Sequence, residues 1–67
     1  MVYGTVAWFD PERGIGAITI EGSGTEVPVT STHIDGGGRQ SLQENAHVAF
    51  TLLDGPDGPR AADVFSP

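Results

Sequence analysis

Glycine and proline recur so closely along this 67-residue chain that only short extended segments fit between them. The ten glycines and five prolines leave little room for an α-helix, because both residue types destabilise a helix interior. Between these breaks, β-branched and aromatic residues alternate with small or polar ones, as in strands with one buried face. The pattern predicts strands over residues 2–10, about 13–21, 26–30, 46–53 and 60–67, separated by turns at "PERG", "GSG" and "DGPDGP".

Five short strands with one long connection after the third predict an all-β fold, a five-stranded antiparallel Greek-key barrel formed by one domain over residues 1–67. The connection over residues 31–45 has no periodicity, and "DGGGRQ" at its centre is expected to be mobile because glycine leaves the backbone unconstrained. The large aliphatic and aromatic residues that alternate inward are the expected core: Val6, Ile18, Val27, Val29, Ile34, Val48, Phe50 and Val64.

The same alternation assigns side chains to the opposite, outward face. Ile15 and Ala17 share one face of the second strand, and Pro28 and Thr30 share the corresponding face of the third, so we expect all four to point outward into solvent. Proline donates no hydrogen bond to a strand ladder, so Pro28 predicts that the third strand is a short edge strand.

Charge and composition narrow the classes of function. Nine acidic residues against three arginines and no lysine give a formal charge of −6, which opposes binding to phosphate polyanions. Without cysteine, the chain has neither disulfides nor a thiolate zinc site. It has no signal-like or membrane-length apolar run, so we expect a soluble cytoplasmic protein with no membrane partner.

Catalytic and metal sites find little support. His33 and His47 could join Asp35 or Asp54 around a metal ion, but their spacing matches no recognised ligand set. The spaced glycine pairs lack the third glycine and the βαβ context of a dinucleotide site. With no nucleophile–base arrangement either, the sequence predicts no enzyme, no catalytic residue, no metal and no cofactor.

Six collinear stretches give the most specific signal: "GTVAWFD" (4–10), "ERGIGAI" (12–18), "VPV" (27–29), "LQEN" (42–45), "VAF" (48–50) and "GPRAADV" (58–64). Through them the chain resembles a cold-shock domain over its whole length. The resemblance implies an OB-type barrel that binds single-stranded RNA or DNA. In that family, bases stack on aromatic side chains of the second and third strands, and lysines contact the phosphates.

The departures from the family pattern lie almost entirely on that binding surface. Where the second strand of the family reads like K-G-F-G-F, this chain keeps a cation in Arg13 but has Ile15 and Ala17 in place of both phenylalanines. The other replacements also remove aromatic or basic groups, at Ala7, Pro28, Thr30, Ser31, Arg39 and Asp57. Because one base stacked on a ring contributes about 1–3 kcal/mol, losing several rings predicts affinity lower by several orders of magnitude.

Two hypotheses of different classes follow. In the first, the protein is a passive binder or chaperone of single-stranded RNA or DNA with reduced affinity. Its candidate base contacts are Trp8, Phe9 and Ile15, and its candidate phosphate contacts are Arg13, Arg39 and Arg60. In the second, a degenerate cold-shock fold binds a protein partner. The candidate surface for this partner is an apolar patch ringed by carboxylates, made of Trp8, Phe9, Ile15, Ala17 and Pro28. A folded remnant without a partner is a third interpretation.

Several of these residues have an ordinary structural interpretation beside the functional one. Trp8 is either a stacking platform or a core ring, because it falls on the Val6 side of a strand that is expected to bend, and the resemblance favours the exposed platform. Phe9 is either its exposed neighbour or packed inside. Arg13 is either a phosphate contact or a solvated turn residue near Asp10 and Glu12, and Arg39 either a base or phosphate contact or a mobile surface arginine.

Overall fold

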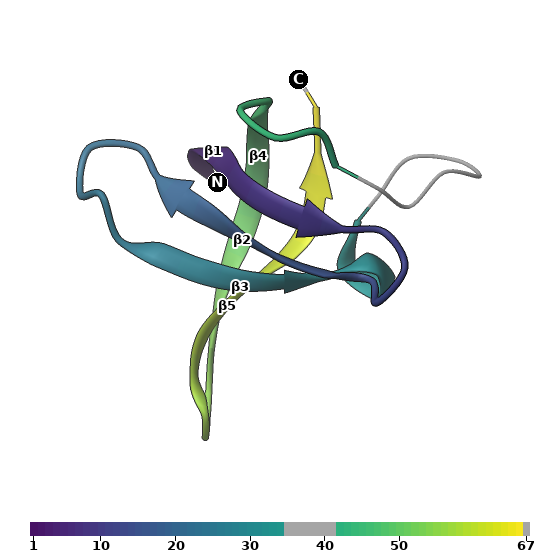
Figure 1. Cartoon of the computed structure of the whole chain (residues 1–67). Helices are drawn as coiled ribbons and strands as arrows, with labels where there is room; N and C mark the ends of the chain where they lie inside the picture. The colour runs from purple at the N-terminus through teal and green to yellow at the C-terminus, as the bar shows by residue number, and fades with distance from the viewer. Residues whose placement is uncertain (35–41, 67) are drawn as a thin grey trace.

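The computed structural model describes residues 1–34 and 42–66. In this part of the chain, five strands form one antiparallel sheet in the order β3-β2-β1-β4-β5 (Figure 1). The strands are β1 (Val2–Asp10), β2 (Ile15–Ile20), β3 (Glu26–Thr30), β4 (His47–Gly55) and β5 (Gly58–Phe65), and a 3-10 turn, η1 (Ser31–His33), follows β3. The all-β prediction with five antiparallel strands is confirmed.

The sheet curls so that its two edge strands, β3 and β5, lie against each other. An isolated parallel bridge between Ile34 and Val64 joins the residue after η1 to β5. The position of β3 at a sheet edge confirms the prediction from Pro28: a central strand uses the N–H of every residue, whereas an edge strand leaves alternate positions without a partner, and proline has no N–H to donate. The glycine segment expected to be mobile, 35–40, lies outside the described residues.

Turn geometry sets the differences between predicted and observed strand ends. Strand β2 begins at Ile15 rather than near Arg13, because Gly14, with φ +68°, closes a tight turn and donates its N–H to the Asp10 carbonyl at 2.8 Å. The turn predicted over "DGPDGP" is shorter than expected. Gly55 pairs with Gly58, so that only Pro56 and Asp57 lie between β4 and β5. Figure 1 shows the resulting hairpin projecting beyond the other strands.

The core lies between the curled halves of the sheet. All eight residues predicted to form it are buried, and Ala61 of β5 joins them in one apolar cluster. The inner face of β1, β2 and β3 contributes a row in which Val6 pairs with Ile18 and Ile18 with Val27. Each fully buried aliphatic side chain of this size stabilises the fold by about 1.5–3 kcal/mol, so the apolar residues at every second position of these strands account for much of the stability of the interior.

A β-bulge in β1 decides which residues reach the outside. The pairing of β1 with β2 shifts between Val6 and Trp8, leaving Ala7 as an extra residue on β1. Without the bulge, residues 6 and 8 would lie on one face, because side chains alternate along a strand. With it, Val6 pairs with buried Ile18 while Trp8 pairs with Ala17 on the opposite face.

Candidate functional site

Two rows of side chains cross the side of β1, β2 and β3 that faces away from the core. In one, Trp8 pairs with Ala17 and Ala17 with Pro28; in the other, Asp10 pairs with Ile15 and Ile15 with Thr30. Residues directly opposite each other on neighbouring strands project to the same side of the sheet. We call the side chains of Trp8, Ile15, Ala17, Pro28 and Thr30 the outer face. The predicted sharing of one face by the four residues from β2 and β3 is confirmed.

Trp8 is the aromatic side chain of the outer face. It is 44% exposed, so the structure decides between the two interpretations that the sequence left open, and Trp8 is a surface ring rather than a core ring. Ile15, in the next row, is 38% exposed. The bulge at Ala7 brings about this exposure, and the sequence carries no sign of it beyond the expected bending of the strand.

Ala17 corrects one prediction. It points away from the core, but only 8% of its surface is exposed, so it does not project into solvent as expected. Its neighbours across the sheet are the larger side chains of Trp8 and Pro28, and it does not belong to the core cluster. A single methyl group between two bulkier residues is covered from the sides, which accounts for the low exposure of Ala17.

Phe9 does not share the outer face, which corrects its place in the predicted apolar patch. Its side chain is half-buried and packs against the core cluster, and it pairs with Gly16. A Cβ atom at Gly16 would lie 2.7 Å from Phe9 Cδ1 and 2.6 Å from the Trp8 carbonyl oxygen. The missing side chain at Gly16 thus makes room for the Phe9 ring, and the packing interpretation of Phe9 is the one that the structure supports.

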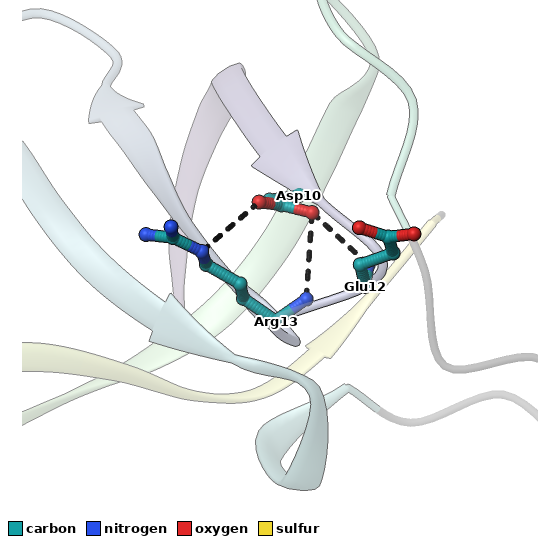
Figure 2. Close-up of polar contacts among 3 residues, drawn as sticks. All are labelled: Asp10, Glu12 and Arg13. Carbon is teal, nitrogen blue, oxygen red and sulfur yellow. Dashed lines mark hydrogen bonds and ion pairs between the residues drawn. The ribbon is translucent and has the colours of Figure 1, made fainter.

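Arg13 lies in the turn next to the outer face, and Figure 2 shows its surroundings. The Asp10 Oδ1 atom accepts hydrogen bonds from the backbone N–H groups of Glu12 at 3.0 Å and Arg13 at 3.4 Å. The Arg13 Nε atom lies 3.8 Å from Asp10 Oδ2, and the arginine side chain is 77% exposed. An exposed pair of this kind contributes about 0.2–1 kcal/mol, so a phosphate could compete for the guanidinium at small cost.

Of the two other candidate arginines, the structure describes Arg60, and Arg60 does not lie at this site. Arg60 is exposed but lies on the β4–β5 hairpin, where it pairs with Leu53. Strand β4 pairs with β1 only through residues 47–50, opposite residues 2–5. Because the two strands are antiparallel, Leu53 lies beyond one end of this paired region and Trp8 lies beyond the other end. Arg39 lies outside the described residues, and its assignment stays a prediction.

Two carboxylates flank the outer face: Asp10, which the sequence analysis placed near Arg13, and Glu26, which it did not name. Asp10 is the β1 member of the Ile15 row. Glu26 is exposed on β3 two residues before Pro28, in a third outward row with Thr5 and Thr19. Strand alternation, which places residues 26, 28 and 30 on one side, was the signal for Glu26, whereas the outward position of Asp10 depends on the bulge at Ala7. The outer face is consequently apolar at its centre and acidic at two opposite corners.

Other kinds of site find no support in the described part of the chain. No three His, Asp or Glu side chains among residues 1–34 and 42–66 come together in a group that could hold a metal ion. No helix there is long and apolar enough to cross a membrane.

Comparisons with known proteins agree with the fold and the motifs. The family model described as the 'Cold-shock' DNA-binding domain matches residues 2–67. The major cold shock protein of Micrococcus luteus is 45% identical over 64 residues, which are 96% of each chain. Cold shock protein CspD of Bacillus subtilis is 44% identical, and cold shock protein CspB of Geobacillus stearothermophilus 45%, each over 64 residues and 96% of both chains.

Proposed function

The chain belongs to the cold-shock domain family, whose members bind nucleic acid without acting as enzymes, and from this premise we propose that it binds single-stranded RNA or DNA passively and with reduced affinity. The observation that supports the proposal best is the exposure of Trp8. A bulge turns this ring out of the core and sets it beside Ala17 and Pro28 on an outward face. An exposed ring on a rigid sheet can stack a base of any sequence.

Each residue of the outer face has a distinct role in this proposal. The Trp8 indole stacks one base, which contributes about 1–3 kcal/mol. Ile15 contacts a neighbouring base through its aliphatic side chain, without the π component of a stacked ring. Pro28 and Ala17 are apolar neighbours of the indole across the sheet, so a base stacked on Trp8 strips no polar side chain of water within that row.

The reduced affinity follows from two deficits. The outer face has one aromatic ring among its five side chains, whereas the family pattern has several in the second and third strands. The electrostatic attraction is also weak, because Arg13 is partly engaged by Asp10 and the formal charge of the chain is −6. Both terms that single-strand binders normally combine, stacking and a positive groove, are therefore small.

A fluorescence titration tests the proposal, since Trp8 is the chain's single tryptophan. Pyrimidine-rich and mixed-sequence oligonucleotides are added at low salt, and the expected result is quenching that saturates by about 1 mM. Two matched variants locate the site: Ile15 and Leu53 are each 38% exposed, one on the outer face and the other on the projecting hairpin. Ile15→Asp should abolish the quenching and Leu53→Asp should leave it unchanged.

A second candidate function, protein binding, is favoured by one observation. An apolar surface with carboxylates at its corners suits a basic peptide with an apolar residue at its centre better than it suits a polyanion. A titration that stays flat well beyond about 1 mM oligonucleotide contradicts nucleic-acid binding and makes this candidate the stronger one.

A further inference from the structure

A second exposed aromatic ring lies outside the outer face, at the start of β1. Tyr3 is 53% exposed and pairs with Ala49 of β4, which in turn pairs with Phe65 of β5. Val48 and Phe50 belong to the core cluster, so Ala49 between them projects to the outside of the sheet. Ala49 is nevertheless fully buried, because the larger side chains of Tyr3 and Phe65 flank it. The Tyr3 ring is therefore supported on its β4 side.

An open hollow of about 480 Å³ adjoins Tyr3. Its lining residues all come from the start of β1 and the end of β2, which lie side by side (Figure 1): Met1, Val2, Tyr3, Glu21 and Gly22. The Glu21 N–H donates a hydrogen bond to the Tyr3 carbonyl at 2.9 Å, and the next pair along the ladder is Gly4 with Ile20. Residues 3 and 21 therefore lie opposite each other and project to the same side, with Cβ atoms about 4.5–5.5 Å apart. The hollow thus combines an aromatic ring with a carboxylate.

This lining selects a cation. Glu21 is exposed, and no cation of residues 1–34 or 42–66, the α-amino group of Met1 included, lies within 4.0 Å of its carboxylate. A guanidinium is planar, so it stacks on an aromatic face and pairs with a carboxylate through two parallel hydrogen bonds. The formal charge of −6 attracts cationic segments from a distance, whereas a phosphate group would be repelled. An arginine side chain therefore fits the hollow best.

The openness of the hollow decides where such an arginine comes from. Pockets for small molecules have similar volumes, about 300–1,000 Å³, but they enclose most of the ligand surface. This hollow is open to solvent, so it cannot enclose a free small molecule in that way. We propose that Tyr3 and Glu21 form a docking site for an arginine side chain of a partner protein, whose remaining surface supplies further contacts. The inference goes beyond the proposed function and does not depend on it.

The docking site and the outer face are separate surfaces. Glu21 is four positions beyond Ala17, the partner of Trp8, which corresponds to about 13 Å along an extended strand. The outward row of Thr5 and Thr19 lies between them. Each surface can therefore be tested while the other stays intact.

A peptide titration tests the docking site. The probe is an acetylated and amidated pentapeptide, Gly-Ser-Arg-Ser-Gly, added to isotope-labelled protein at low salt. The backbone N–H signals of Tyr3, Glu21 and Gly22 should shift progressively over about 1–20 mM peptide. The same peptide with lysine should bind about two- to fivefold more weakly, and with the neutral isostere citrulline it should leave these signals unchanged. No shift with the arginine peptide, or equal affinity for the lysine peptide, overturns the inference.

Three variants test the two groups of the site. Tyr3→Leu keeps an apolar side chain over Ala49 and removes the ring, and Glu21→Gln removes the carboxylate. Each should weaken binding of the arginine peptide by about two- to fivefold. Asp54→Asn is the matched control, because it removes an equal charge from an exposed position on the β4–β5 hairpin, and it should weaken binding less than twofold. Equal weakening by Glu21→Gln and Asp54→Asn would mean that net charge alone attracts the peptide, and the docking site would be wrong.

The outcomes separate this inference from the functions proposed for the outer face. If the arginine peptide shifts the Trp8 indole and Ile15 signals instead of those of Tyr3, Glu21 and Gly22, the outer face is the protein-binding surface and the Tyr3 site is wrong. If oligonucleotides leave the Trp8 fluorescence unchanged but the peptide shifts the Tyr3 signal, nucleic-acid binding is wrong and the docking site stands.

Discussion

On the inner side of β1, β2 and β3, Val6, Ile18 and Val27 form a row in which no side chain is more than 1% exposed. On the outer side of the same strands, the corresponding row has one ring, Trp8, beside Ala17 and Pro28. The inner row has the size and apolar character that a barrel core needs, and the outer row offers one ring for the base stacking that we propose. Because side chains alternate along a strand, the two requirements fall on different residues and can change independently.

The largest effect that tests this comparison is on stability. Ile18 and Ile15 have the same side chain and lie on the same strand, one fully buried and the other 38% exposed. Ile18→Ala should lower the free energy of unfolding by about 2–5 kcal/mol, because it removes buried methylene groups and leaves a cavity. Ile15→Ala should lower it by less than about 0.5 kcal/mol. Urea denaturation followed by Trp8 fluorescence measures both, and similar losses would mean that the two faces are not distinct.

The next effect concerns affinity and the outer face. Ile15→Phe, Pro28→Phe and Thr30→His together place three rings beside Trp8, each worth about 1–3 kcal/mol to a stacked base. Ala17 is left unchanged, since it is nearly covered and a ring there would displace Trp8 or Pro28. Affinity for pyrimidine-rich DNA should rise by about a hundredfold or more, equivalent to about 2.7 kcal/mol.

The control variant adds an exposed aromatic ring outside the outer face. Leu53→Phe adds an exposed ring on the β4–β5 hairpin and should leave the affinity unchanged. If the triple variant folds and its affinity stays flat, the missing rings are not what limits binding, and the charge of −6 becomes the explanation.

A third prediction concerns the contact between the two faces at Gly16. The Cβ atom of Gly16→Ala would lie 2.6 Å from the Trp8 carbonyl oxygen and 2.7 Å from Phe9 Cδ1, so the Phe9 ring or the β1 backbone must move. We expect a loss of about 1–3 kcal/mol in the free energy of unfolding and a shifted Trp8 emission maximum. Gly55→Ala is the matched control, because its Cβ would meet the nearest atom at an ordinary 3.7 Å. Equal losses in the two variants would show that Gly16 has no special part in placing Phe9 and Trp8.

The sequence predicted one face of these strands better than the other, and the reason is physical. The eight core residues were predictable because burial of large apolar side chains at every second position is what forms the strands. Whether Trp8 is exposed depended instead on the bulge at Ala7, which inserts one residue and reverses the alternation beyond it. The low exposure of Ala17 could not be predicted from the sequence either. It depends on the sizes of the neighbours of Ala17 across the sheet, and these neighbours are identified only once the strand pairing is known.

The smallest effect that we predict is on the salt dependence of the nucleic-acid affinity. It is tested by comparing two arginines, Arg13 and Arg60, rather than the two faces of the sheet. For single strands, the logarithm of the affinity falls with the logarithm of salt concentration by about 0.7 per neutralised phosphate, so three arginines allow a slope no steeper than about −2. Arg13 lies beside the outer face, whereas Arg60 lies on the hairpin that extends away from Trp8. Arg13→Gln should therefore make the slope shallower by about 0.7, and Arg60→Gln should not change it. Titrations at several salt concentrations measure both slopes.

A shallower slope in Arg60→Gln would mean that Arg60 contacts a phosphate after all, and the nucleic acid would then have to cross the barrel from the outer face of β1–β3 to the hairpin. A slope much steeper than about −2 in the unchanged protein would mean that cations other than these arginines, or more than one copy of the chain, contact the phosphates.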